Sequence, residues 1–139
     1  MVQFFQDYRI IGSADVQMLG DLFEQLLNKG FKQNEGQFFT PTPITRFIWD
    51  SLPLKQIMTK TDGIEYPKII DYACGAGHFL TEGFEAVEIC ANAIDSNTEP
   101  SNQWVEKKIF GIEKDYRLAR VSKISSWLIN SSAIVDAGL

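Results

Sequence analysis

The fold is constrained most by one short segment, DYACGAGHFL at residues 71–80. Residues 68–72, with Ile69 and Ile70 side by side, predict a short strand, and apolar side chains at helical spacing predict a helix over residues 78–93. The loop between them, residues 73–77, consists of small residues. Its two glycines have no Cβ atoms, so the backbone can adopt positive φ angles and a ligand can approach it closely. The segment therefore predicts a strand, a tight loop and a helix, with a ligand site at the loop.

The alternation of strand and helix continues toward the C-terminus. Residues 108–113 predict a second strand, residues 115–128 a second helix, and residues 133–136 a third strand. Strands that alternate with helices in this way form a parallel sheet with right-handed crossovers. The sequence therefore predicts an α/β fold, namely the opening half of a doubly wound, Rossmann-like sheet with three parallel strands.

The residues that precede this pattern predict a helical extension. Ser13 can cap a helix over residues 14–29, whose apolar side chains form one stripe. Thr42 can cap a second helix, which has Pro43 at its first position and ends near Leu52.

These patterns divide the chain into three parts. We expect a helical N-terminal extension over residues 1–52, a polar connector over residues 53–67, and the first half of an α/β domain over residues 68–139. The third predicted strand is cut off near the last residue, so we expect the domain to be truncated.

The glycine loop departs from the pattern of a dinucleotide site. A pyrophosphate site requires G-x-G-x-x-G, and Leu80 stands at the position of the third glycine. Asp71, at the end of the first strand, would repel a pyrophosphate but suits a cationic amino acid group. The alternative is a tight turn that binds no ligand.

Glu113 stands at the end of the second predicted strand. A carboxylate at this place can accept two hydrogen bonds from a ribose. The alternative is an exposed glutamate that caps the next helix. The glycine loop after the neighbouring strand favours the ribose role.

A third motif, GQFFTP at residues 36–41, lies upstream of both. Two aromatic residues precede a rigid Thr-Pro pair and can close over a small ligand. Taken alone the motif is weak, because aromatic side chains usually belong to a hydrophobic core.

The order of the three motifs, GQFFTP, DYACGAGHFL and FGIEKDYRLAR, resembles adenine-specific DNA methyltransferases. The similarity is greatest to modification subunits of type I restriction systems and to related single-chain restriction-modification enzymes, and it covers about residues 18–136. The resemblance implies a class I S-adenosylmethionine-dependent methyltransferase fold. It also implies S-adenosyl-L-methionine as the cofactor and the exocyclic amino group of adenine in DNA as the methyl acceptor.

The resemblance assigns cofactor contacts to individual residues. The segment that contacts the methionine part corresponds to Gln37, Phe38, Phe39, Thr40, Pro41 and Thr42. The first cofactor loop corresponds to Asp71, Ala73, Gly75, Ala76, Gly77 and His78. Glu113 corresponds to the ribose-binding acid and Asp136 to the acid beside the adenine ring of the cofactor.

The chain also differs from the family pattern. Tyr72 replaces a usual proline, and His78 replaces a frequent glycine and can narrow the loop. The family holds the flipped adenine with Asn-Pro-Pro-Tyr or Asn-Pro-Pro-Phe, and no Pro-Pro occurs in this sequence. We therefore expect no catalytic residue in this chain, no metal, and no methylation of DNA by this chain alone.

Charge and cysteine content restrict the partners and the compartment. The net charge of −5 and the scattered lysines and arginines predict weak DNA binding, so DNA and a specificity subunit should be bound through regions outside this chain. Cys74 and Cys90 have neither zinc-site nor CxxC spacing, so we expect both to be reduced. The sequence begins without signal-peptide features and has no apolar run of about 20 residues, which predicts a cytoplasmic protein.

Two alternatives to a DNA methyltransferase remain open from the sequence. One is a non-catalytic cofactor-binding or assembly module. The other is a methyltransferase of the same fold that acts on RNA or protein.

Overall fold

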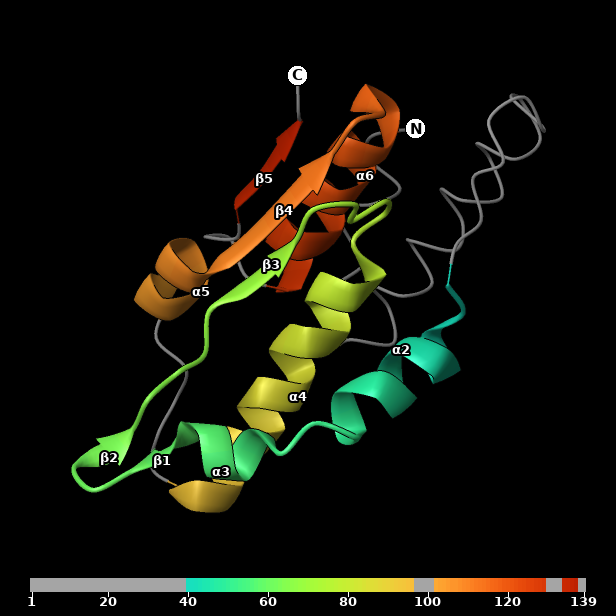
Figure 1. The fold of residues 1–139 in the computed structure, drawn as a ribbon. Helices are drawn as coiled ribbons and strands as arrows, with labels where there is room; N and C mark the ends of the chain where they lie inside the picture. The colour runs from blue at the N-terminus through green and yellow to red at the C-terminus, as the bar shows by residue number, and fades with distance from the viewer. Residues whose placement is uncertain (1–39, 97–101, 130–133, 138–139) are drawn as a thin grey trace, which may run out of the picture.

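Three parallel strands form one sheet in the computed structural model, which describes residues 40–96, 102–129 and 134–137. They are β3 (Ile69–Asp71), β4 (Ile109–Glu113) and β5 (Ile134–Ala137), and they lie in the order β3-β4-β5 (Figure 1). Parallel pairing joins Ile70 to Phe110 and Gly111 to Val135. The predicted α/β class is confirmed, and all three predicted strands are present.

Two helices cover the same face of this sheet. Helix α4 (His78–Ile94) contacts β3 and β4, helix α6 (Tyr116–Ile129) contacts β4 and β5, and the two helices contact each other. Because the helices cover only one face of the sheet, buried and exposed residues alternate along the strands. Ile69 and Ile109 are buried, whereas Ile70 and Ile112 are exposed.

Helix α4 is surrounded on several sides. Its buried residues include Leu80, Val87 and Ala91, which recur at helical spacing. It begins after Gly77 and ends at Asp95, where the backbone becomes extended.

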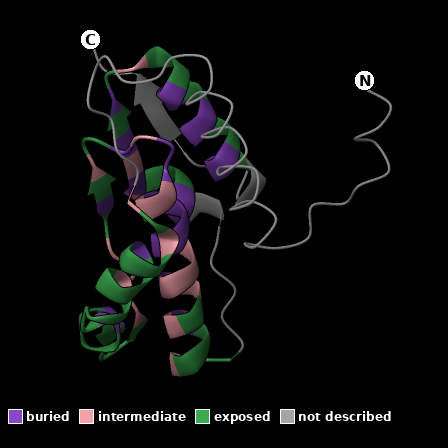
Figure 2. Ribbon diagram, turned by 90° about the vertical axis from the view of Figure 1, so that its right-hand side faces the viewer, coloured by how far each residue is buried: buried purple, intermediate pink, exposed green. Residues whose placement is uncertain are grey.

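Figure 2 shows buried residues recurring along α6 as well. No helix in the described part of the chain is long and apolar enough to cross a bilayer.

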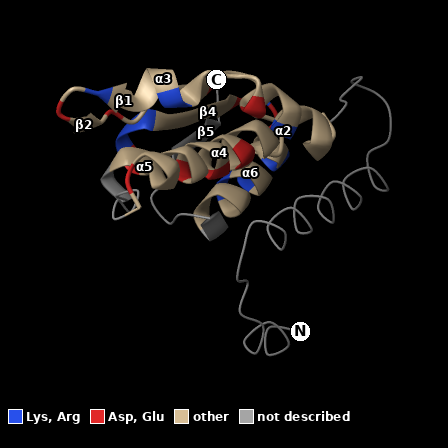
Figure 3. Cartoon of the chain, turned by 90° about the horizontal axis from the view of Figure 1, so that it is seen from below, with Lys and Arg blue, Asp and Glu red and all other residues tan. Residues whose placement is uncertain are grey.

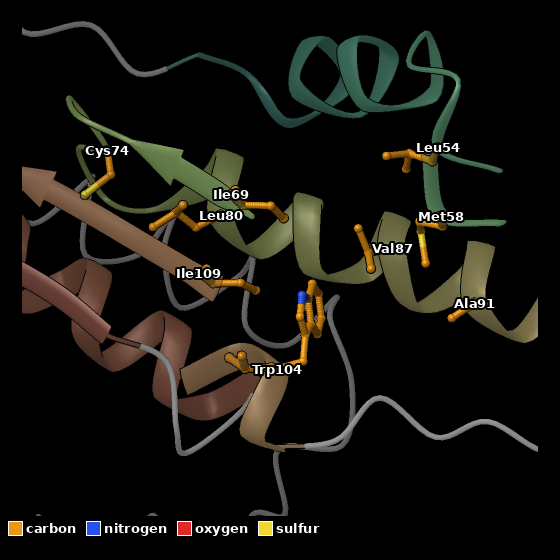
Figure 4. Packing of buried hydrophobic residues seen from close by; sticks show 10 residues of the cluster. Leu54, Met58, Ile69, Cys74, Leu80, Val87, Ala91, Trp104 and Ile109 are labelled. Carbon is orange, nitrogen blue, oxygen red and sulfur yellow. The ribbon is translucent and has the colours of Figure 1, made fainter. Parts of the chain in front are cut away.

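The hydrophobic core follows α4 along its length (Figure 4). Cys74 and Leu80 lie at the end near the glycine loop, and Met58 and Ala91 lie at the other end. The Trp104 ring lies between them, 5.8 Å from the Phe84 ring and 5.0 Å from the Tyr66 ring, measured between centroids. The core thus anchors the first turn of α4 and, with it, the loop that precedes the helix.

Helix α2 (Thr42–Asp50) packs against α4. The prediction that Thr42 caps this helix was wrong: the N-cap is Pro41, Thr42 is the first helical residue, and no side chain caps the helix. Proline at the cap has no side-chain acceptor, and its carbonyl instead accepts the backbone N–H groups of Ile44 and Thr45.

The segment over residues 53–67, expected as a polar connector, contains regular structure. It forms α3 (Leu54–Met58) and an antiparallel hairpin of β1 (Thr59–Lys60) and β2 (Gly63–Ile64). Leu54 and Met58 are one helical turn apart and both are buried, which explains why a short helix is stable here.

Residues 102–108 also differ from expectation. Helix α5 (Asn102–Lys108) lies between the first predicted helix and the second predicted strand, and it includes the first residue predicted for that strand. The Trp104 indole donates to the carbonyl of Pro67, and the Lys108 ammonium donates to the carbonyl of Tyr66. Lys108 therefore holds the chain before β3.

Candidate functional site

The glycine loop has the backbone conformation that its sequence predicts. Gly75 has φ 54° and Gly77 has φ 92°, both in the region that favours glycine. Gly77 also lies against α6, because a Cβ atom added there would be 2.5 Å from the Ser122 hydroxyl oxygen. Both the φ angle and the close approach of α6 therefore require glycine at position 77.

Four backbone N–H groups of this loop are bound by protein acceptors. The N–H of Ala73 donates to the Asp71 carboxylate, and that of Cys74 donates to the carbonyl of Ile112. The N–H of Gly75 donates to Glu113, and that of Gly77 donates to the carbonyl of Cys74. A loop that cradles phosphates must offer such N–H groups to the ligand. These four are not available for that purpose.

The Glu113 side chain joins two loops. It is only 9% exposed, and its two oxygens accept separate backbone hydrogen bonds, from Gly75 at 2.8 Å and from Asp115 at 2.7 Å. An ionised carboxylate has about four lone-pair sites, so about two remain for a ligand. This burial contradicts the exposed position in the alternative reading of Glu113, while its hydrogen bond to Asp115 lies directly before α6.

The end of β3 carries a second carboxylate. Asp71 is half-buried and forms a local turn through Ala73, whereas Tyr72 is 79% exposed. Because β3 and β4 are parallel neighbours, Asp71 and Glu113 lie at the same edge of the sheet. The edge therefore combines two acidic side chains with a loop in which the N–H groups of Ala73, Cys74, Gly75 and Gly77 are occupied.

Cys74 lies beneath the loop, with its sulfur 3.7 Å from the Ser122 hydroxyl oxygen. Burial raises the pKa of its thiol to about 11. Cys90 is free as well. The Cys74 thiol stays protonated at neutral pH and fills space in the core.

The high pKa of Cys74 predicts a loss of stability at alkaline pH. The unfolded thiol ionises near pH 9 and the folded thiol near pH 11, so the contribution of Cys74 is complete below about pH 9 and falls as the pH rises toward about 11. Urea unfolding across this range should show a smaller decline for Cys74→Ser than for the parent chain. An identical decline in both proteins would contradict the assignment.

The turn after β4 is held by residues that the sequence analysis did not single out. Asp115 accepts the backbone N–H of Arg117 and pairs with its guanidinium, and these hydrogen bonds lower the pKa of Asp115. The Arg120 guanidinium lies 4.3 Å from the centre of the Tyr116 ring. An aspartate at the start of a helix and an arginine two residues later are the local signals for this turn.

The α2–α4 contact was also absent from the sequence analysis. Arg46 pairs with Glu82, which is only 4% exposed, at 3.0 Å, and this hydrogen bond raises the pKa of Arg46. The Trp49 indole donates to the carbonyl of Phe79 at 2.9 Å, and its ring lies over Gly83. Helix α2 is thus attached to the first two turns of α4.

The predicted site residues fall into three groups. The first is brought together at the edge of the sheet: Asp71, Ala73, Gly75, Ala76, Gly77, His78 and Glu113. Asp136 lies in β5 with its backbone paired to Ile112, one residue before Glu113. Of the upstream segment, Thr40 and Pro41 precede α2 and Thr42 begins it, while Gln37, Phe38 and Phe39 lie outside the described residues.

This arrangement favours one kind of ligand. Two carboxylates disfavour a phosphate group at this edge, and they favour a ligand with hydroxyl donors and a positive charge. Gly75 has no side chain, so a ligand can approach the backbone there, whereas the Cβ direction of Gly77 is filled by Ser122.

Comparison with known proteins identifies the family of the chain. The chain is 30% identical over 103 residues to the type I restriction enzyme EcoEI methylase subunit of Escherichia coli, a match that covers 73% of this chain and 18% of that protein. It is 34% identical over 94 residues to the type II methyltransferase M.VspI of Vibrio sp. (strain 343), covering 63% of this chain and 21% of that protein. The chain thus spans about a fifth of the length of these relatives. A model of the N-6 DNA methylase family matches residues 14–134, and the chain belongs to this family.

Proposed function

We propose that this chain binds S-adenosyl-L-methionine at the edge formed by the glycine loop and the end of β4. The single observation that carries the proposal is the Glu113 carboxylate, which is buried, fixed by two backbone N–H groups and still able to accept two more hydrogen bonds. Ribose hydroxyls fit this remaining capacity. Asp71 at the same edge suits the positively charged amino acid part of the cofactor.

The whole protein would transfer a methyl group to the exocyclic amino group of adenine in DNA. When bound, the cofactor supplies an electrophilic methyl group on a sulfonium. The residues of this chain would orient that group: Glu113 would hold the ribose, and the glycine loop would allow close approach. The sheet that carries them would be the first half of a Rossmann-like methyltransferase domain, which residues 53–67 would join to the N-terminal extension. Catalysis would rest on positioning, without a side-chain nucleophile.

DNA would be bound mainly through other parts of the protein. The net charge of −5 disfavours contact with phosphates. Lysine and arginine are interspersed with aspartate and glutamate over the described residues (Figure 3). A specificity subunit in the cytoplasm would supply recognition, as the resemblance implies.

Calorimetry with two ligands tests the proposal. S-adenosyl-L-methionine should bind the chain, and ATP should not, because two carboxylates face the site and four loop N–H groups are occupied. Asp71→Asn should weaken cofactor binding by roughly tenfold, the order of one charge-assisted contact. Asp62→Asn, in the exposed hairpin turn, is the matched control and should leave affinity unchanged. Preferential binding of ATP would refute the proposed ligand.

A further inference from the structure

The two loops that border the proposed cofactor site are joined by one side chain. Glu113 belongs to β4, yet one of its oxygens binds Gly75 in the loop after β3 and the other binds Asp115 in its own loop. The neighbouring strand also contributes a backbone contact, from the Cys74 N–H to the Ile112 carbonyl at 3.0 Å. The glycine loop is therefore held from the β4 side at two successive residues.

Burial strengthens the hydrogen bonds that Glu113 accepts. At 9% exposure the carboxylate has little access to water, which would otherwise compete for these hydrogen bonds. Hydrogen bonds to a charged acceptor are about twice as strong as those between neutral groups. Removal of the acceptor would leave the Gly75 and Asp115 N–H groups in need of new partners.

We propose that Glu113 is a positioning residue that fixes the glycine loop to the β4–α6 turn before any ligand binds. This role rests on the proposed function, because it concerns the shape of the cofactor site, but it adds an action that does not pass through the ribose. A ribose acceptor alone needs no contact with the loops. Both oxygens of Glu113 are bonded to them.

Substitutions at position 113 separate geometry from charge. Glu113→Gln keeps the size but has a single acceptor oxygen, so its NH₂ group must face one of the two backbone N–H groups. Glu113→Asp keeps the charge but is one methylene shorter and cannot keep both contacts. Glu106→Gln, on the exposed side of α5, makes the same chemical change away from the site and is the matched control.

Amide hydrogen exchange of the ligand-free chain, resolved by residue with NMR, is the first measurement. The amides of Gly75 or Asp115 should exchange roughly ten- to a hundredfold faster in Glu113→Gln and in Glu113→Asp, and at the parent rate in Glu106→Gln. If Glu113→Gln does not fold, Glu113→Asp decides the result. Unchanged exchange at both amides would overturn the proposal.

Binding of a 2′,3′-dideoxy analogue of S-adenosylhomocysteine is the second measurement. This analogue has no ribose hydroxyls for Glu113 to bind, and Glu113→Asp keeps the negative charge, so a loss of its affinity in this variant must act through the loops. We expect Glu113→Asp to weaken its binding by about tenfold. Equal affinity in parent and variant would restrict Glu113 to direct ribose contact and overturn the positioning role. If the parent chain binds neither S-adenosylhomocysteine nor the analogue, the proposed function is contradicted. The positioning role is then tested by amide exchange alone.

Discussion

Replacement of Gly77 by alanine should destabilise the chain by about 2–5 kcal/mol and abolish cofactor binding. The φ angle of 92° is unfavourable for alanine, which costs about 1–2 kcal/mol in the left-handed region. The new Cβ would also lie 2.5 Å from the Ser122 hydroxyl oxygen and 3.3 Å from the Ser122 Cα. Overpacking of this kind costs about 1–3 kcal/mol. Relief requires the loop to move away from α6, and this displaces Gly75 from Glu113.

Gly63→Ala is the matched control for this substitution. Gly63 also has a positive φ, 130°, but a Cβ there would meet nothing within 4 Å. Urea unfolding should therefore show a smaller loss for Gly63→Ala than for Gly77→Ala, and calorimetry should show unchanged cofactor affinity. Equal losses in the two variants would mean that the contact with Ser122 contributes nothing.

Apart from α5, the order of strands and helices after residue 67 could be predicted from the sequence because local signals there agree with tertiary structure. Apolar residues at helical spacing in α4 are the residues that the core buries, such as Leu80 and Val87. The two glycines of the loop are the residues at which its backbone has positive φ angles. The proximity of Glu113 to the glycine loop could be predicted because parallel pairing brings the ends of β3 and β4 together.

Other features depend on partners distant in sequence and could not be predicted from local patterns. Helix α2 has Ile44, Phe47 and Ile48 on one face, but all three are exposed, and the helix is attached through Arg46 and Trp49 instead. Helix α5 is only seven residues long and depends on the burial of Trp104 against the core, so periodicity was too weak to reveal it.

The attachment of α2 should depend strongly on one aromatic side chain. Trp49→Ala removes the ring over Gly83 and the hydrogen bond to the Phe79 carbonyl. Truncation of a buried tryptophan costs about 3–5 kcal/mol, and Trp49 is only partly buried, so we expect a loss of about 2–4 kcal/mol. Trp127→Ala, which truncates the same side chain at an exposed site on α6, should cost much less.

The effect of Gly83→Ala on the free energy of unfolding should change sign with the residue at position 49. In the parent chain the new Cβ would lie 2.3 Å from the Trp49 Cζ2 atom, and the resulting overpacking, about 1–3 kcal/mol, should exceed the gain of about 1 kcal/mol from replacing a helical glycine. In the Trp49→Ala background the clash is absent, so the same change should stabilise the chain by about 1 kcal/mol. A double-mutant cycle of urea unfolding measures the difference, and Trp127→Ala provides the background in which Gly83→Ala must remain destabilising. Additive effects of Trp49→Ala and Gly83→Ala would show that the indole ring does not lie over Gly83 in solution, and α2 would then be held by Arg46 and Glu82 rather than by the ring.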